Sequence, residues 1–336
     1  MPKAKRVFIS DCEGPISKND NAFELSSKFI PYGDKIFPVV SRYDDVLADV
    51  VKKPKYKAGD TLRLILPFFK AYEVTDKMMI EESSNNILFV PEAPNTLKAI
   101  SKLASTFIVS TSYEHYIRAL CGQIDFPFEN TYSTRLNLDS FGITETEKEE
   151  LKKTASEIAN MPVINIPKSN RLEEFSEEDK RNIERLDYIF WKRTPQMTVG
   201  RILNEVNPIG GYEKANAVKN ITKKLGVDLA DTMYVGDSIT DVEAFRLVRE
   251  GSGLTVSFNG NNYAVREAEI GVTSPDTSAI EFIAGTFIQE GKEDLLDELK
   301  RFPRIETITQ ENMEEFSKHS SKFRKTVRGE AVGKLG

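Results

Sequence analysis

The chain has 336 residues, of which 40% are hydrophobic and 29% charged, and its formal net charge is −6 at pH 7. The length fits one large domain with an insertion or two domains, and the composition is that of a globular protein. The negative charge does not favour nucleic acid as a partner, and the sequence holds no run of about 18 apolar residues that would predict a membrane span.

Cysteine and histidine are rare, with two residues of each type. Cys12 and Cys121 indicate a reducing, cytoplasmic setting rather than a disulfide framework. Two histidines do not suffice for a His/Cys metal cluster and give little support to a Ser-His-Asp hydrolase. Because the first apolar run follows closely on the initial methionine, we expect no signal peptide.

The first apolar run, Val7–Ile9, leads directly to Asp11 and Glu13 and then to a Gly-Pro turn. A short apolar run that ends at turn residues predicts a buried strand. Ligands of open α/β sheets bind beyond the carboxyl ends of strands, and residues two apart in an extended chain share one side. We therefore expect both carboxylates to face one site, with Cys12 between them pointing away.

Residues 18–88 differ from this strand in pattern. Apolar residues recur at helical spacing in 37–51, and a second apolar segment, 61–74, is expected to be a helix that bends near Pro67. These features predict a mostly helical insertion that folds as a lid over the strand ends. An outer helical layer of the core would fit the same pattern.

The middle of the chain predicts a helix over 91–103 and then a strand over 107–109 that leads to Ser110 and Thr111. Hydroxyl and N–H groups at a strand end can hold a phosphate oxygen, although a plain helix N-cap favours the same residue types. Between 136 and 204 the pattern is mainly helical and includes a capping box at Thr144.

A helix is predicted over 212–225, and Lys214 lies in its first turn, where negative charge is normally preferred. The lysine therefore either contacts a ligand such as phosphate or lies on the surface in solvent. A second apolar run then breaks at Gly236 and leads to Asp237 and Asp241. If the two acidic stretches follow neighbouring strands, their carboxylates repel one another unless a cation neutralises them. A few hard oxygen ligands suit Mg²⁺, which favours phosphate-bearing partners.

Beyond a predicted last core strand at 271–273, two amphipathic helices are expected from residue 288 onward. The segment 318–336 has a net charge of +5, with Glu330 as its one acid. Such a basic tail predicts a contact with an acidic surface or nucleic acid, or a solvated terminus. Its cations are Lys318, Lys322, Arg324, Lys325, Arg328 and Lys334.

These stretches carry a family resemblance. The Asp-x-Glu-Gly sequence at Asp11 and the Gly-Asp-Ser-x-x-Asp sequence at Gly236 resemble motifs I and IV of the haloacid dehalogenase superfamily of Mg²⁺-dependent phosphotransferases. Residues 107–112 resemble motif II, and 210–215 resemble the motif III region, where a lysine opens a helix. Residues 253–261 resemble the strand and loop after motif IV in phosphoserine-phosphatase-like members. The motifs follow the family order.

The resemblance implies an α/β fold with a Rossmann-like core, a parallel sheet covered by helices on both faces, and a mostly helical cap. The cap would be 18–88. Residues 136–204 would be a second insertion or a helical decoration, and 288–336 would form the C-terminal helices and the basic tail. The core would comprise residues 1–17, 89–135 and 205–287.

The resemblance also implies a Mg²⁺-dependent phosphatase that acts on a small phosphorylated metabolite through an aspartyl-phosphate intermediate. Asp11 would be the nucleophile and Glu13 the general acid and base. Lys214 would assist catalysis and bind the phosphate. Ser110 and Thr111 would bind the phosphate as well. The metal ligands would be Asp11, Glu13 (through its main-chain carbonyl), Asp237 and Asp241.

The sequence departs from the family pattern at two positions. Most members have Asp where this chain has Glu13, although enolase-phosphatases also have Glu, and many have Thr where Pro15 stands. We expect these departures to affect the rate of the reaction and the choice of substrate more than the identity of the nucleophile. The chain also resembles archaeal proteins of the energy-converting hydrogenase A subunit R type. That resemblance implies a catalytically weak accessory or binding protein, with the basic tail as a protein contact. Phosphomutase or phosphonate chemistry is a third alternative.

Overall fold

The computed structural model describes residues 5–299 and 305–335. Its centre is a seven-stranded sheet with the strand order β3-β2-β1-β4-β5-β6-β7. All neighbouring strands pair in parallel except β7, which is antiparallel to β6. The strands are β1 (Val7–Ser10), β2 (Ser105–Tyr113), β3 (Thr131–Thr134), β4 (Thr232–Gly236), β5 (Leu254–Phe258), β6 (Ile270–Val272) and β7 (Ile305–Thr307). The predicted parallel α/β sheet is confirmed. Strand β7 was not predicted, because a strand of three residues is too short to show a recognisable alternation of apolar and polar residues.

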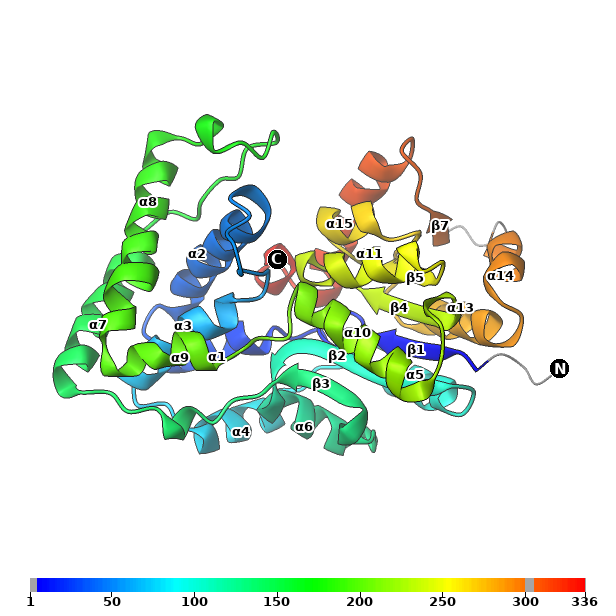
Figure 1. Cartoon of the computed structure of the whole chain (residues 1–336), viewed down its shortest axis with the longest axis horizontal. Coiled ribbons are helices and arrows are strands. Elements are labelled where there is room, and N and C mark those ends of the chain that lie inside the picture. The colour runs from blue at the N-terminus through cyan, green and yellow to red at the C-terminus, as the bar shows by residue number, and fades with distance from the viewer. Residues whose placement is uncertain (1–4, 300–304, 336) are drawn as a thin grey trace.

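Helices cover both faces of this sheet, as Figure 1 shows. Because side chains alternate along a strand, Phe8 of β1 packs with α5, α6 and α13 on one face, whereas Val7 and Ile9 pack with α10 and α11 on the other. Burial on both faces explains why β1 is a continuous apolar run. These helices are α5 (Ala93–Ser101), α6 (Glu114–Ile124), α10 (Tyr212–Leu225), α11 (Val242–Glu250) and α13 (Ser278–Gln289).

The two long intervals between the strands, 18–88 and 136–204, pack into one helical layer. Their apolar side chains share one buried cluster, in which Phe68 of α3 lies edge-on to Phe190 just after α8. Figure 1 shows this layer at one end of the sheet. Its helices are α1 (Asn21–Phe29), α2 (Gly33–Asp45), α3 (Thr61–Ala71), α4 (Asp76–Asn85), α7 (Glu145–Ala159), α8 (Glu177–Tyr188) and α9 (Ile202–Glu205).

Local sequence signals set several helix ends as predicted. Thr144 and Glu147 exchange side-chain and main-chain hydrogen bonds in a capping box at the start of α7. Gly226, with φ 64°, ends α10 in the left-handed conformation that glycine adopts without strain. These contacts lie within a few residues of chain, so the sequence pattern suffices to predict them.

The C-terminal part contains the two helices expected after residue 288, together with a short helix that follows β5. They are α12 (Asn262–Glu267), α14 (Lys292–Leu299) and α15 (Met313–Arg328). Helix α15 packs against α12, and the chain then ends between the helical layer and the sheet (Figure 1). Among the described helices, none combines the length and apolar character that crossing a membrane requires.

Candidate active site

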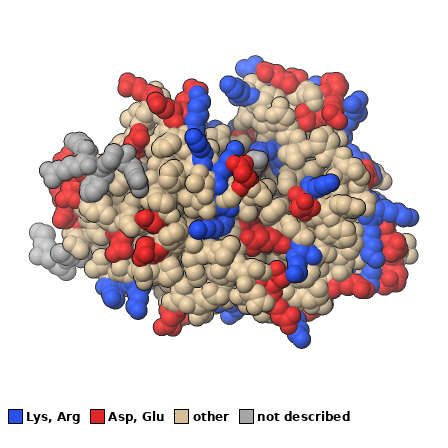
Figure 2. All heavy atoms as spheres, turned by 180° about the vertical axis from the view of Figure 1, so that it is seen from behind, with Lys and Arg blue, Asp and Glu red and all other residues tan. Residues whose placement is uncertain are grey.

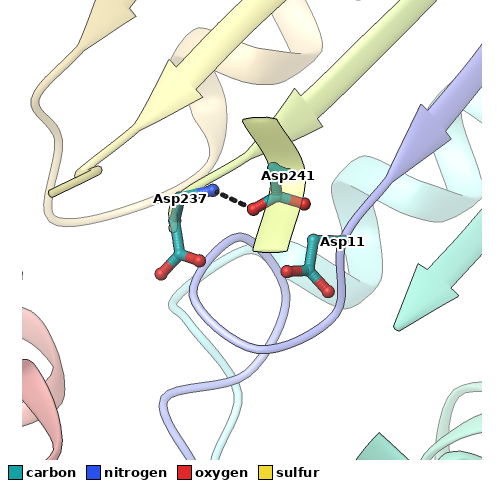
Figure 3. A group of neighbouring side chains, drawn as sticks. All are labelled: Asp11, Asp237 and Asp241. Atoms are coloured by element: carbon teal, nitrogen blue, oxygen red, sulfur yellow. Dashed lines mark hydrogen bonds between the residues drawn. The ribbon is translucent and has the colours of Figure 1, made fainter. Parts of the chain in front are cut away.

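Three buried aspartates converge beyond the carboxyl ends of β1 and β4, as Figure 3 shows. Asp11 follows β1, and Asp237 and Asp241 follow β4. Each contributes a carboxylate oxygen to a group of three that lie within 4.8 Å of one another. The convergence arises because β1 and β4 are parallel neighbours, with Ser10 beside Val235, so that both strands lead to the same edge of the sheet.

Asp11 is held between a lysine and the backbone. Its Oδ2 accepts a hydrogen bond from Lys214 Nζ at 2.6 Å, and its Oδ1 accepts one from the N–H of Cys12 at 2.6 Å. Burial raises the pKa of Asp11 to about 7, because desolvation outweighs the attraction of Lys214. Burial disfavours the charge on Lys214, but the carboxylates of Asp11 and Asp241 more than offset this and raise the lysine pKa.

Asp241 has donors on both of its oxygens. Oδ1 accepts from Lys214 Nζ and from the Tyr234 hydroxyl, both at 2.8 Å. Oδ2 accepts from the N–H of Asp237 at 3.0 Å, as Figure 3 shows, and from the N–H of Ser238, also at 3.0 Å. A carboxylate has about four acceptor positions, so these hydrogen bonds occupy all of them. Asp241 therefore positions Lys214 and the loop after β4, and one of its oxygens also belongs to the acidic group that could hold a metal ion.

Asp237 is contacted by two arginines that the sequence motifs do not include. Its Oδ2 accepts from Nη1 of Arg324 and, at 3.1 Å, from Nη1 of Arg328, both on α15. The loop after β1 also approaches closely, because a Cβ on Gly14 would lie 2.0 Å from the same oxygen. Gly14 has φ +104°, a conformation that favours glycine. The one sequence signal for the arginines was the net positive charge of their segment.

Glu13 lines the same small cavity as Asp11 and Asp237. Its Oε1 accepts a hydrogen bond from the N–H of Asn21 at 2.7 Å. The pKa of Glu13 is raised well above its ordinary value by burial, with a further contribution from Asp20 and opposition from Arg328. Glu13 is thereby biased toward the protonated form that a general acid needs.

The two hydroxyl residues of β2 differ in their surroundings. Ser110 Oγ donates to Ser112 Oγ at 3.1 Å and accepts from the N–H of Ser112 at 3.2 Å. Thr111 lines the cavity, and its buried Oγ1 has no hydrogen-bond partner among the described residues. Because an unpaired buried hydroxyl is costly, Thr111 is the better placed of the two to donate to a ligand oxygen.

Cys12 points away from the cavity, as the alternation predicts. Its side chain is buried in an apolar cluster with Phe8 and Ile16. The pKa of the thiol is raised well above its ordinary value, first by burial and then by the charges of Glu13 and Asp11. A buried thiol with a raised pKa is a poor nucleophile.

The cavity between these residues has a volume of about 90 Å³. Asp20, Asp44 and Asp45 reach its wall from the segment 18–88, so the helical layer covers the strand ends. A groove of about 660 Å³ adjoins it and shares Arg324 with it. Helix α2 lines one side of the groove, and α12 and α15 line the other. Lys and Arg side chains gather along the hollow between the two lobes in Figure 2.

The chain is similar to known proteins in its sequence pattern and in its fold. The family model described as haloacid dehalogenase-like hydrolase matches residues 63–279. The gene product AF1437 of Archaeoglobus fulgidus has a similar structure, with a TM-score of 0.85 and 28% identity, over 99% of this chain and 99% of that chain. A phosphoserine phosphatase solved as a phospho-aspartyl intermediate analogue has a TM-score of 0.48 and 13% identity, over 83% of this chain and 98% of that chain. No curated protein matches the sequence.

Proposed function

The chain belongs to the haloacid dehalogenase-like hydrolase family, and we propose on this basis that it is a Mg²⁺-dependent phosphomonoester hydrolase with Asp11 as the nucleophile. One observation carries the proposal. Asp11 lies buried at a strand end, in contact with Lys214, close to Asp237, and in the wall of a cavity that is also lined by Thr111, whose buried hydroxyl has no partner among the described residues. This set combines a nucleophile, a cation and a free hydrogen-bond donor.

The donors at this site fit a hard divalent ion. Asp11 and Asp237 offer carboxylate oxygens that lie close together, and oxygen ligands suit Mg²⁺. Such an ion, when bound, supplies positive charge that shields the incoming phosphate from the carboxylates. The main-chain carbonyl of Glu13 is proposed as a further ligand, and Asp241 would act through Lys214.

The protein groups have separate tasks in the proposed reaction. Asp11 attacks phosphorus, the bond from phosphorus to the leaving oxygen breaks, and Glu13 gives that oxygen a proton. Glu13 then takes a proton from the water that hydrolyses the aspartyl-phosphate, which releases phosphate and restores Asp11. Lys214 and Thr111 interact with the phosphate oxygens, on which charge accumulates during transfer.

The helical layer is proposed to act as the cap that selects a small phosphorylated metabolite. Its segment 18–88 contributes Asp20, Asp44 and Asp45 to the cavity wall. Residues 136–204 share an apolar cluster with that segment. The two intervals would therefore move together if the cap opens to admit substrate.

Phosphate release from a panel of phosphomonoesters tests the proposal. We expect turnover that requires Mg²⁺ and that is abolished in Asp11→Asn. Asp294→Asn, an exposed position on α14, is the matched control and should retain full activity. Equal turnover in the Asp11 variant and the control would contradict the assigned nucleophile.

A second candidate function is favoured by the two arginines on Asp237. Their guanidinium groups already neutralise the carboxylate that the proposed ion would need. A catalytically weak accessory protein of an archaeal hydrogenase-type complex could keep such an arrangement. Its protein contact would use the exposed cations of the tail, such as Lys322. The absence of turnover on the whole panel would favour this candidate.

A further inference from the structure

Helix α15 is built so that one stripe of its surface reaches into the candidate site. Phe316 anchors the helix in an apolar cluster with Ile308, and Ser320 Oγ donates to the carbonyl of Gly260 at 2.7 Å. Arg324 and Arg328 continue this stripe at intervals of four residues, a spacing that places side chains on one side of a helix. The anchored part of the helix therefore directs both arginines toward Asp237.

The two guanidinium groups share a single carboxylate oxygen. Both contact Oδ2 of Asp237, and Nη1 of Arg324 also donates to the main-chain carbonyl of Asp237 at 3.2 Å. Arg324 is only 3% exposed, and its buried Nε has no hydrogen-bond partner among the described residues. Two buried cations therefore stand where the carboxylate would otherwise attract a metal ion.

The same helix also ties the core to the start of the helical layer. Arg328 donates from Nε to the carbonyl of Lys18 at 3.1 Å and from Nη2 to the carbonyl of Asn19, in the segment that leads into α1. Arg324 donates from Nη2 to the carbonyl of Leu335 at 3.3 Å. Both arginines and Leu335 line the cavity, whose volume of about 90 Å³ is well below the range of about 300–1,000 Å³ typical of small-molecule sites.

We propose that α15 is an autoinhibitory latch, in which Arg324 and Arg328 act as built-in cations that compete with a divalent metal ion for Asp237. A metal ion on Asp237 and the guanidinium groups repel one another, so binding of one weakens binding of the other. Withdrawal of the arginines would also release Lys18 and Asn19 and enlarge the cavity for substrate. The latch rests on the proposed function in one respect, namely that a metal ion binds beside Asp11.

Calorimetric titration of Mg²⁺ into the full chain tests the latch. We expect Arg324→Met and Arg328→Met to bind Mg²⁺ at least about tenfold more tightly than the unmodified protein, because each removes a like charge close to the ion. Lys322→Met removes a cation from an exposed position on the same helix and should leave the affinity unchanged. Unchanged or weaker Mg²⁺ binding in both arginine variants, or equal tightening in Lys322→Met, would overturn the proposal.

Hydrogen exchange on the unmodified protein is a second test, and its result does not depend on whether the variants fold. The latch predicts that saturating Mg²⁺ speeds amide exchange in 313–335, whereas equal or slower exchange would overturn it. The outcome is separable from that of the proposed function. Tighter Mg²⁺ binding in the arginine variants with no phosphate release would support the latch and contradict the hydrolase. Mg²⁺-dependent phosphate release with unchanged metal affinity in those variants would support the hydrolase and contradict the latch.

Discussion

Lys214 Nζ lies 2.6 Å from Oδ2 of Asp11, although 203 residues separate the two in the chain. The lysine is completely buried, and its second carboxylate contact is Asp241. A cation in this position neutralises two acids at once and, in the proposed reaction, would contact a phosphate oxygen on Asp11. The pair thus links the stability of the site to its proposed chemistry.

Lys214→Met should lower kcat/KM for phosphate release by about 10²–10³-fold, the usual effect of removing one charge-stabilising donor. It should also lower the free energy of unfolding by about 3–5 kcal/mol, because buried carboxylates lose their partner. Steady-state kinetics and urea denaturation measure the two effects. Lys219→Met, an exposed position later on the same helix, is the control, and a similar loss of activity in that variant would count against a special role for Lys214.

Thr111→Val should weaken inhibition by inorganic phosphate by about 10–100-fold, the value of one hydrogen bond to a charged group. Its stability should change little, because Oγ1 of Thr111 has no partner to lose. Ser110→Ala should show the opposite pattern, with a stability loss of about 1 kcal/mol and nearly unchanged inhibition, because its hydroxyl bonds within the protein. Phosphate inhibition constants and thermal melts distinguish the two residues, and reversed patterns would assign the phosphate to Ser110.

Gly14→Ala should disrupt both the fold and the site. The new Cβ would lie 2.0 Å from Oδ2 of Asp237, at a backbone φ of +104°, so either the loop or Asp237 must move. We expect a loss of several kcal/mol in the free energy of unfolding, of which about 1–3 kcal/mol is backbone strain. Gly285→Ala is the control, since a Cβ there meets nothing within 4 Å and should stabilise α13 by about 0.5–1 kcal/mol. Equal stability of the two variants in urea denaturation would contradict this close approach.

The buried carboxyl of Asp44 should make stability pH-dependent. Its pKa is raised to about 7, first by burial and then by the charge of Asp60, although hydrogen bonds from Tyr56 and Gly59 oppose this. Because the folded pKa exceeds the unfolded value, the contribution of Asp44 is present below about pH 4 and is lost as pH rises toward 7. Each pH unit in this window costs up to about 1.4 kcal/mol.

Urea denaturation at pH 5 and pH 8 measures this effect. Between these values the unmodified protein should lose more free energy of unfolding than Asp44→Asn, whose side chain does not titrate. Asp294→Asn, at an exposed position on α14 and far from α2 in the chain, should follow the unmodified protein. An identical pH dependence in all three proteins would show that Asp44 does not titrate in this range.

The sequence predicted the ends of β1 and β4 well because their signals are local. It was wrong for β2, which continues to Tyr113, so that Ser110 and Thr111 lie within the strand and not beyond a predicted end at 109. The apolar runs before Asp11 and Asp237 and the Gly-rich entry to α10 lie within a few residues of the groups they position. The same holds for the capping box at Thr144. The parallel sheet followed from the alternation of strands and helices, so that neighbouring strand ends could be expected to bring these carboxylates together.

Features that depend on packing between distant segments were not predictable in this way. Arg324 reaches Asp237 across 87 residues, and only the docking of α15 on α12 brings them together. The charge of the tail predicted either a contact with an acidic surface or nucleic acid or a solvated terminus, whereas the side chains of Arg324 and Arg328 are buried against Asp237. The distinction between Ser110 and Thr111 likewise depends on which hydroxyl finds a partner in the folded chain.

The most direct test of the central claim is to look for the phosphoryl group on Asp11 itself. The protein is mixed with Mg²⁺ and a phosphomonoester that it hydrolyses. The reaction is quenched in acid within the first turnover, and the protein is digested with trypsin. Mass spectrometry should find one added phosphoryl group on the peptide 7–18, at Asp11, and none in Asp11→Asn. Phosphate release that proceeds without any phosphoryl group on this peptide, and that persists in Asp11→Asn, would contradict the account.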